Sequence, residues 1–297
     1  ASYSADENQT SVGTATATDA DGDSVTFTIS GSDLSITSSG VITFNSAPNY
    51  ESTNSYSATV TASDGTRPST QNITVSVNNV NESPSITSSA SFSANENQTS
   101  IGTVSVSDPE NDTISYSVSG TDASSVSISS SGVLTFGSAP NYESKSSYSF
   151  TATASDGSLS ASQNITVSIG DVNEAPTAIS LSASAIDENA SGSIVGTLTT
   201  TDVDAGDTTE YSLSGTDADS FEVVDGKLKL KSGVSADYET KTSYSVTVTV
   251  TDSGGLTTSN AFTVSVNNLN DNDPSITSSA SYSADENQTS VGTATAT

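Results

Sequence analysis

In Tyr244-Ser245-Val246-Thr247-Val248-Thr249-Val250, apolar and hydroxyl-bearing residues alternate without interruption. The run Val25-Thr26-Phe27-Thr28-Ile29, near the other end of the chain, alternates in the same way. A period of two residues with many β-branched side chains is typical of strands that bury one face and expose the other. Both runs therefore predict antiparallel sheets, and an all-β fold for the chain.

Seven short strands can be placed in the first repeat, with turns rich in Ser, Gly and Asp between them. The predicted strands are Ser2–Ser4, Gly13–Thr18, Ser24–Ser30, Leu34–Thr37, Val41–Asn45, Ser55–Ser63 and Gln71–Asn79. Alternation then assigns the inward positions Val25, Phe27, Ile29, Ile42, Phe44, Tyr56, Ala58, Val60, Ile73, Val75 and Val77. Seven strands in roughly 90 residues match a Greek-key β-sandwich of the immunoglobulin type.

The same pattern recurs along the chain. Ala1–Thr18 (ASYSADENQTSVGTATAT) is repeated without change as Ala280–Thr297. Self-similarity at intervals of about 90 residues is typical of an array of similar units. A Glu-Asn pair marks the start of each unit, at Glu7-Asn8, Glu96-Asn97, Glu188-Asn189 and Glu286-Asn287. We expect domains at residues 1–82, 83–174 and 175–272, with 273–297 as the opening strands of a next copy, and both ends internal to a longer protein.

The apolar content limits the stability of each unit. Only 32% of residues are hydrophobic, so the cores are expected to be thin. A domain of this size buries about 60–65% of the surface of its unfolded chain and is marginal alone. We therefore expect the domains to need support from outside their own cores.

Charge and composition exclude several classes of partner. Six basic residues against 35 acidic ones give a net charge of −29, which repels nucleic acids and anionic membranes. Cys and His are absent, so the chain offers no disulfide and none of the soft or imidazole ligands that zinc and copper prefer. No apolar run reaches the roughly 20 residues of a membrane-spanning helix. A bound hard cation is the expected counter-charge.

Five acidic or amide motifs return at corresponding places in the repeats. They are a Glu near the first strand, a loop of spaced carboxylates, an Asn/Asp-Tyr-Glu motif, an Asp after a late strand, and a junction that ends in Pro. The carboxylate loops are Asp19–Asp23, Asp108–Asp112 and Asp202–Asp207, and the Tyr motifs are Asn49–Glu51, Asn141–Glu143 and Asp237–Glu239. The late Asp residues are Asp64, Asp156 and Asp252, and the junctions are Asn79–Pro84, Asp171–Pro176 and Asn268–Pro274.

This set of motifs resembles the cadherin repeat. The junction Asn268-Leu269-Asn270-Asp271-Asn272-Asp273-Pro274 is similar to the cadherin linker Asp-x-Asn-Asp-Asn-x-Pro, and Asp237-Tyr238-Glu239 fits the Asp-x-Glu motif. The first two junctions are one residue shorter, and Asn49 and Asn141 replace the first Asp of that motif. The short Val-Asn-Glu-x-Pro form resembles the cadherin-like repeats of giant bacterial surface proteins. The resemblance covers nearly the whole chain and implies cadherin-like sandwiches in an elongated array.

The resemblance also implies Ca²⁺ at the junctions, and the residue types agree, because Ca²⁺ takes six to eight oxygen ligands. The first junction would use Glu7, Glu51, Asn79, Asn81, Glu82, Asp108, Glu110 and Asp156. The second would use Glu96, Glu143, Asp171, Asn173, Glu174, Asp202, Asp204 and Asp252. The third would use Glu188, Asp237, Glu239, Asn268, Asn270, Asp271 and Asn272, and a preceding copy would face Asp19, Asp21 and Asp64.

Other interpretations of these residues are disfavoured. The loop at Asp19–Asp23 is not an EF-hand, because Ser24 and Ser30 occupy the places of its required Gly and Glu. Without His or Cys, catalysis would need a Ser–Lys or carboxylate pair, and the carboxylates here recur at junctions. We therefore expect no enzyme. The aromatic residues of the Tyr motifs are expected to pack against the core: Tyr50, Tyr142 and Tyr238.

The function expected from these features is mechanical or adhesive. We expect a secreted, cell-surface stalk of a repetitive bacterial adhesin, rigidified by Ca²⁺, whose partners are the neighbouring repeats of the same chain. The alternative is a subunit of an extracellular fibre or sheath that associates laterally with other copies. Direct cell–cell adhesion or sugar binding by the repeats stays open, whereas nucleic acid and membrane contact by this region are not expected.

Overall fold

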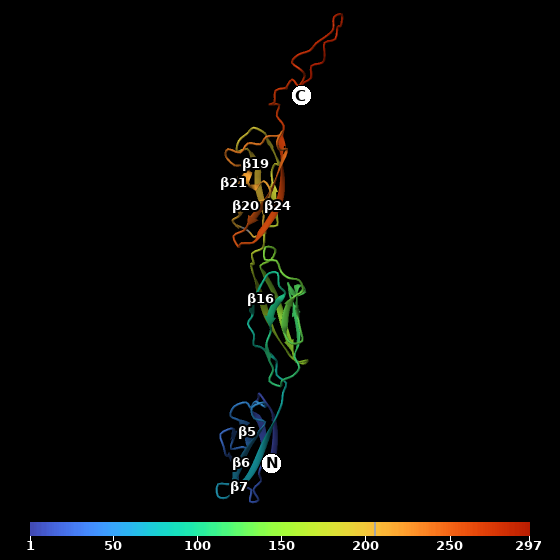
Figure 1. The fold of residues 1–297 in the computed structure, drawn as a ribbon. Coiled ribbons are helices and arrows are strands. Elements are labelled where there is room, and N and C mark those ends of the chain that lie inside the picture. The colour runs from blue at the N-terminus through green and yellow to red at the C-terminus, as the bar shows by residue number, and fades with distance from the viewer. Residues whose placement is uncertain (205) are drawn as a thin grey trace. The chain divides into compact units, whose positions relative to one another are not determined.

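The computed structural model describes residues 1–204 and 206–297, which divide into two compact units, Ala1–Val172 and Asn173–Thr297. The described residues form strands, drawn as arrows in Figure 1, and two single-turn 3₁₀ helices are present among them. The predicted fold class, tandem all-β sandwiches, is confirmed.

The first sandwich consists of a four-stranded sheet, β1-β7-β6-β3, and a three-stranded sheet, β2-β5-β4. The strands are β1 (Ser2–Asp6), β2 (Ser11–Thr14), β3 (Thr26–Ile29), β4 (Leu34–Ile36), β5 (Val41–Phe44), β6 (Ser55–Ser63) and β7 (Pro68–Asn78). Strands β6 and β7 pair antiparallel over nine positions, whereas β1 runs parallel to β7, with Tyr3 opposite Val75. The first and last strands of the sandwich, β1 and β7, therefore lie side by side and run in the same direction.

The second sandwich repeats this plan within the same unit. Its sheets are β12-β15-β16-β9, β10-β14-β13 and a short pair, β11-β8. The elements are β8 (Ser85–Ile86), β9 (Ser91–Asn95), β10 (Ser100–Thr103), β11 (Val106–Ser107), β12 (Ser115–Ser119), η1 (Ala123–Ser125), β13 (Val126–Ile128), β14 (Val133–Phe136), β15 (Ser147–Ser155) and β16 (Ser160–Gly170).

The third sandwich belongs to the second unit and has two four-stranded sheets, β17-β19-β22-β21 and β18-β24-β23-β20. The elements are β17 (Ala178–Leu181), β18 (Ala185–Asp187), β19 (Ile194–Thr201), β20 (Glu210–Ser214), η2 (Ala218–Ser220), β21 (Phe221–Val224), β22 (Lys227–Leu230), β23 (Ser243–Thr251) and β24 (Thr257–Asn267). In residues 268–297 a single bridge, between Ile276 and Ala296, is present.

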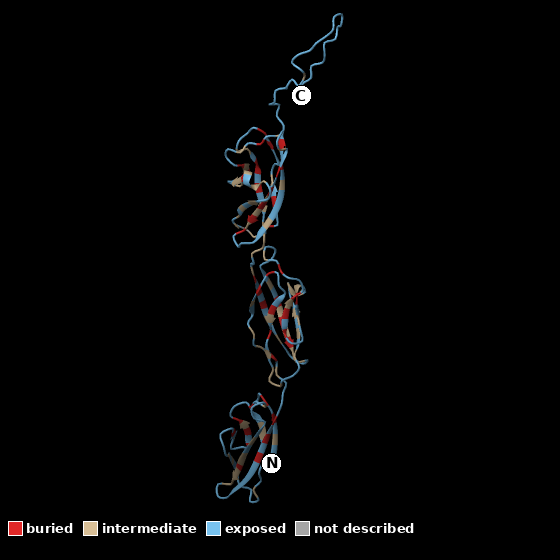
Figure 2. Ribbon diagram, in the orientation of Figure 1, coloured by how far each residue is buried: buried red, intermediate tan, exposed pale blue. Residues whose placement is uncertain are grey.

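Each sandwich has its own apolar core between its sheets, and the buried residues lie along the strands (Figure 2). Of the inward positions predicted in the first sandwich, Ile42, Phe44, Val60, Ile73, Val75 and Val77 are buried, and Phe27, Ile29, Tyr56 and Ala58 pack against them. Tyr50, Tyr142 and Tyr238 each pack against the core of their own sandwich, as predicted.

The second strand of the first sandwich ends earlier than the sequence predicts. Alternation predicts Gly13–Thr18, but β2 covers Ser11–Thr14, and the last backbone bond beyond it joins Ala15 N to Gly40 O at 2.8 Å. Gly40 has a φ of 90°, and a Cβ there would lie 2.2 Å from the Ala15 carbonyl oxygen, so this turn requires glycine. Thr16–Thr18 alternate correctly, but no strand of the described residues pairs with them.

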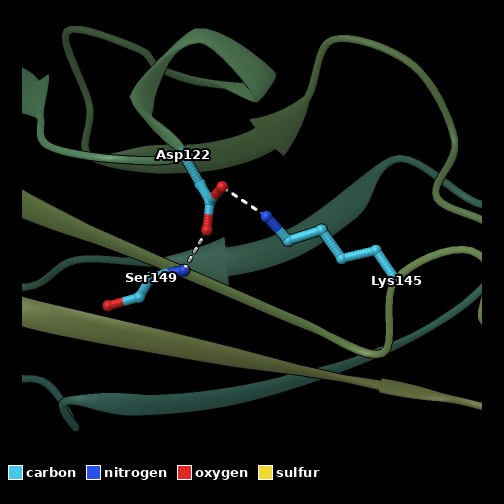
Figure 3. A network of polar contacts seen from close by, with 3 residues as sticks. All are labelled: Asp122, Lys145 and Ser149. Atoms are coloured by element: carbon cyan, nitrogen blue, oxygen red, sulfur yellow. Dashed lines mark hydrogen bonds and ion pairs between the residues drawn. The ribbon is translucent and has the colours of Figure 1, made fainter.

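A polar network holds the η1 turn of the second sandwich to the start of β15 (Figure 3). The carboxylate of Asp122 accepts hydrogen bonds from Lys145 Nζ and, at 2.8 Å, from the backbone N–H of Ser149. The Lys145 ammonium also lies 4.7 Å from the ring centroid of Tyr148. The Lys145 hydrogen bond, followed by that of Ser149, lowers the pKa of Asp122. The third sandwich repeats the network with Asp217, Lys241 and Ser245.

Replacing Lys145 tests this network. In Lys145→Gln the pKa of Asp122 should rise toward that of an ordinary Asp, because its largest stabilising contact is lost, while the Ser149 N–H keeps the pKa somewhat lowered. Since the folded-state pKa lies below the unfolded one, Asp122 stabilises the fold above about pH 4 and loses that contribution as pH falls through its folded pKa. Carboxyl NMR titration measures this shift.

The matched control is Lys231→Gln, which removes the same charge from an exposed lysine of the third sandwich. It should leave the titration of Asp122 unchanged. An Asp122 curve that is identical in the wild type and in Lys145→Gln contradicts the assignment.

Candidate functional site

A buried glutamate follows the first strand of the main sheet in every sandwich. Glu7, Glu96 and Glu188 are only 1–2% exposed. The next residue in each case is an Asn with a φ near +60°, a left-handed conformation that Asn tolerates better than most residues. That turn follows directly on the strand and places the glutamate at the end of the sandwich.

Each buried glutamate binds two backbone N–H groups that are distant in sequence. In the first sandwich Glu7 accepts from Tyr50 N at 2.7 Å and from Val80 N at 2.8 Å. Glu96 accepts in the same way from the N–H groups of Tyr142 and Val172, and Glu188 from those of Tyr238 and Leu269. The glutamate therefore fastens the Tyr motif to the segment that leaves the last strand.

Other carboxylates gather around these glutamates. Oxygens of Glu7, Glu51 and Glu82 lie within 4.8 Å of one another, and so do oxygens of Glu188, Asp237 and Glu239. Three of the ligands predicted for the first junction and three of those predicted for the third thus lie close together. Such like charges repel one another unless a cation is present.

The segment Asn79–Pro84 brings further donors to this end of the first sandwich. Asn8 donates to Glu82, the backbone N–H of Glu82 donates to Glu110 Oε2 at 3.2 Å, and Asn81 Nδ2 donates to Asp156 Oδ2 at 2.9 Å. The linker therefore contacts acidic residues of the carboxylate loop and the late Asp of the second sandwich. The predicted ligand Asn79 is exposed.

Hydrogen bonds lower the pKa of the late Asp residues Asp156 and Asp252. The Asn81 amide, followed by the backbone N–H groups of Leu159 and Ser158, lowers the pKa of Asp156. Burial acts to raise the pKa of Asp252, but the Asn173 amide and the backbone N–H of Leu256 outweigh it, so the pKa of Asp252 is also lowered.

The second unit contains a further cluster, at the start of the third sandwich. Oxygens of Asp202, Asp207 and Asp252 lie within 4.8 Å of one another. Asn173 Nδ2 donates to Asp252 at 3.0 Å, and the backbone N–H of Glu174 donates to Asp204 at 2.8 Å. This arrangement brings five predicted ligands (Asn173, Glu174, Asp202, Asp204 and Asp252) together with one residue, Asp207, that was not among them.

Asp207 could have been found from the sequence. Each carboxylate loop ends in a further Asp: Asp23, Asp112 and Asp207. Recurrence at that place is the same signal that selected the other ligands. The predicted ligand set takes only the first two acidic residues of each loop and therefore leaves out all three of these residues.

The unsatisfied oxygens in these clusters fit a hard cation. Among the described residues, the buried carboxylate oxygens without a hydrogen-bond donor include Asp108 Oδ2, Glu110 Oε1, Asp202 Oδ2, Asp204 Oδ1 and Asp207 Oδ2. A buried charged oxygen without a partner is costly. Since all of these potential metal ligands are oxygen atoms, the chemistry of the set fits Ca²⁺.

The predicted ligands Asp19, Asp21 and Asp64 of the first sandwich lie outside these acidic clusters. Asp19 accepts from the backbone of Asp21 and Asp23, and Asp64 from that of Thr66 and Arg67, which lowers the pKa of Asp64. No close group of three acidic oxygens includes Asp19, Asp21 or Asp64 within the described parts of the chain.

At the C-terminal junction the contacts are local. Asp271 accepts from Asn189 and from Asn272, Asn268 Nδ2 lies 3.5 Å from Glu239 Oε1, and Asn270 is exposed. At the second junction the predicted ligands Glu96, Glu143 and Asp171 belong to the first unit, and Asn173, Glu174, Asp202, Asp204 and Asp252 to the second. Their convergence remains a prediction.

Two family models match the sequence, one in each of the two units. Residues 182–267 match the family model "Cadherin domain", and residues 81–168 match "Bacterial Ig domain". No curated protein matches the sequence. Among the described residues, no helix has the length and apolar character of a membrane span.

Solved structures share the fold at low sequence identity. The chain is 23% identical to mouse cadherin-23 EC22–24, with a TM-score of 0.59, covering 90% of this chain and 96% of that one. It is 24% identical to the protocadherin GammaB4 extracellular domain, with a TM-score of 0.68, covering all of this chain and 53% of that one. For the human desmocollin-1 ectodomain the identity is 17%, the TM-score 0.51, and the coverage 93% and 62%. The chain is therefore a tandem series of cadherin-like β-sandwich repeats.

Proposed function

We propose that this region is a calcium-rigidified extracellular stalk of a repetitive surface adhesin. The observation that carries the proposal is the set of contacts that the linker makes in the first unit. Glu82 lies close to Glu7 and accepts a hydrogen bond from Asn8, both in the first sandwich. The backbone N–H of Glu82 and the side chain of Asn81 donate to Glu110 and Asp156 of the second sandwich. The match of residues 81–168 to a bacterial Ig domain supports a bacterial surface protein.

Hydrogen bonds within the first unit hold the proposed calcium ligands in position. Glu7 is fixed by the N–H groups of Tyr50 and Val80, so its carboxylate is held in place before any ligand binds. Asn81 orients Asp156, and the backbone N–H of Glu82 orients Glu110. Bound Ca²⁺ would supply the charge that neutralises these oxygens and links them.

This arrangement makes the stiffness of the linker depend on calcium. Without a cation, carboxylates within 4.8 Å of one another repel and favour separation. With it, the same oxygens become shared ligands, and the linker loses its freedom to bend. Extracellular modules bind Ca²⁺ with dissociation constants of roughly 10⁻⁴–10⁻³ M, which suits a protein outside the cell.

Small-angle X-ray scattering tests the stalk directly. The radius of gyration and maximum dimension should be larger and better defined in about 5 mM Ca²⁺, well above the expected dissociation constants, than in chelator. A control in NaCl of equal ionic strength separates ligation from screening. Scattering curves that are the same in calcium and in chelator would remove the proposed mechanism.

A further inference from the structure

Half of the basic residues of this acidic chain lie in one row. The chain has six, and three of them, Lys227, Lys229 and Lys231, belong to β22 or follow directly on it. Leu228 and Leu230, which alternate with them, are buried, so the lysines stand on the outer face of the sheet β17-β19-β22-β21. Alternate residues of a strand are about 6.6–6.8 Å apart, and the row is therefore a straight line of positive charge.

Most of this charge is available to a partner. Lys229 pairs with Glu222 of β21 at 3.2 Å. Lys227 and Lys231 are exposed, and neither forms an ion pair with a residue that the structure describes. Glu222 and the exposed Asp225, in the turn before β22, offset part of the positive charge. The three lysines still outnumber these two carboxylates.

Two exposed apolar side chains flank the row. Ile194 of β19 stands opposite Lys229 and is 56% exposed, and Val224 of β21 stands opposite Lys227 and is 43% exposed. A partner that covers them would gain the free energy of burying apolar surface. The whole surface is called the lysine face here: Ile194, Glu222, Val224, Lys227, Lys229 and Lys231.

The fold itself does not require the lysine face. In the other two sandwiches the same strands pair in the same register and with the same bulge, but Ser11 and Ser100 stand where the third sandwich has Ile194. The places of the three lysines are taken by Val41, Thr43 and Asn45 in the first sandwich and by Val133, Thr135 and Gly137 in the second. Because a row of like charges repels itself, a binding role explains these lysines better than the sheet does.

The complement of the lysine face is an anionic partner from outside this chain. The equivalent faces of the first two sandwiches are uncharged at these positions, so they offer no carboxylates to a second copy. None of the acidic clusters includes a residue of the lysine face. At physiological ionic strength, exposed charges more than about 8 Å apart are largely screened. The net charge of −29 therefore does not cancel this local positive surface.

Among polyanions, the residues of the face favour an acidic polysaccharide. The lysine face contains neither Arg nor an aromatic residue, which single-stranded nucleic acids use for stacking. Recognition of an anionic membrane takes clusters of about 4–8 basic residues. A straight row of ammonium groups instead matches the regularly repeated carboxylates of a uronate chain.

We propose that the lysine face binds an acidic polysaccharide whose uronate carboxylates lie along β22. The ammonium groups of Lys227, Lys229 and Lys231 donate hydrogen bonds to the carboxylates, and Ile194 and Val224 pack against the sugar rings. This gives the region a ligand of its own, beyond the role of a stalk. The site shares no residue with the predicted calcium ligands, so binding does not require calcium.

Fluorescence anisotropy of labelled hyaluronan oligosaccharides, titrated with the full chain in chelator and about 0.1 M NaCl, tests the proposal. The anisotropy should rise to saturation with the wild type, whereas labelled dextran, which is uncharged, should show no change. Changing Lys227, Lys229 and Lys231 together to Gln should weaken binding about tenfold to a hundredfold, because three charge contacts are lost. Lys231→Gln alone, at an exposed position, should lose part of the affinity.

The other three basic residues of the chain provide the matched control. Changing Arg67, Lys145 and Lys241 together to Gln gives the same net charge and should leave binding unchanged. Replacing the three lysines of the face by Arg should preserve binding, and circular dichroism checks that each variant is folded. The proposal is overturned if the wild type does not bind, or if both sets of Gln substitutions weaken binding equally. A wild type that binds phosphatidylglycerol vesicles or single-stranded DNA, but not the oligosaccharides, also overturns it.

Discussion

Adding about 10 mM Ca²⁺ to the calcium-free chain should raise the melting temperature of its sandwiches by about 10–20 °C. With a dissociation constant of about 10⁻⁴ M, the ligand is at roughly 100 times that constant and stabilises the folded state by about 2.7 kcal/mol per site. For domains of this size, 1 kcal/mol corresponds to about 4–8 °C. Differential scanning calorimetry in calcium and in chelator measures the shift.

Substitution in the third sandwich locates this effect. Asp252→Asn should remove most of the calcium-dependent gain of that sandwich, because it neutralises one of three carboxylates that lie within 4.8 Å of one another. Asp219→Asn, which removes the same charge from an exposed Asp within η2, should leave the gain intact. Equal melting temperatures with and without calcium, at matched ionic strength, would mean that these clusters do not bind the ion.

Glu188→Ala should lower the free energy of unfolding of the third sandwich by about 3 kcal/mol, even in chelator. Glu188 is 1% exposed and accepts from the N–H groups of Tyr238 and Leu269 at 2.7 and 2.6 Å. Each hydrogen bond to a charged group contributes about 1.5–3 kcal/mol. Glu188→Gln, which keeps the shape and one acceptor oxygen, should lose about half as much. Urea denaturation in chelator measures both without any contribution from metal.

Glu239→Ala separates this structural role from ligation. Glu239 belongs to the same cluster but is exposed. Its removal should leave stability in chelator unchanged or slightly raised, since one repelling charge is lost, while it weakens the response to calcium. If Glu188→Ala and Glu239→Ala had the same effect in chelator, Glu188 would have no separate structural role.

The sequence predicts the fold well because its signals are local. Alternation along Tyr244–Val250 is a property of neighbouring residues, and it selects both the strand and its buried face. The end of β2 was predicted wrongly for the opposite reason. Thr16–Thr18 have the pattern of a strand, but pairing needs a partner strand, which alternation within the segment cannot reveal.

Recurrence in the sequence identified the acidic clusters but not all the roles within them. Glu7 was predicted as a ligand, but its bonds to the N–H groups of Tyr50 and Val80 join positions 43 and 73 residues away. Those bonds follow from the folded backbone and leave no separate signal in the sequence. Asp207 was recognised as the last carboxylate of its loop but, like Asp23 and Asp112, was not assigned as a ligand, because the predicted set takes only the first two acidic residues of each loop.

The parallel pairing of β1 with β7 determines how a sandwich resists being pulled by its two ends. Tension on the entering and leaving segments slides these strands past each other, so the five paired positions from Ser2–Thr74 to Asp6–Asn78 are loaded together and must break together. In an antiparallel pair loaded at adjacent ends, the bonds would open one after another at low force. The same geometry recurs in β16 with β9 and in β24 with β18. Each sandwich is therefore expected to unfold slowly under load. The unfolding rate is set by the barrier to breaking these paired strands, and that barrier does not require calcium at the ends of the sandwich.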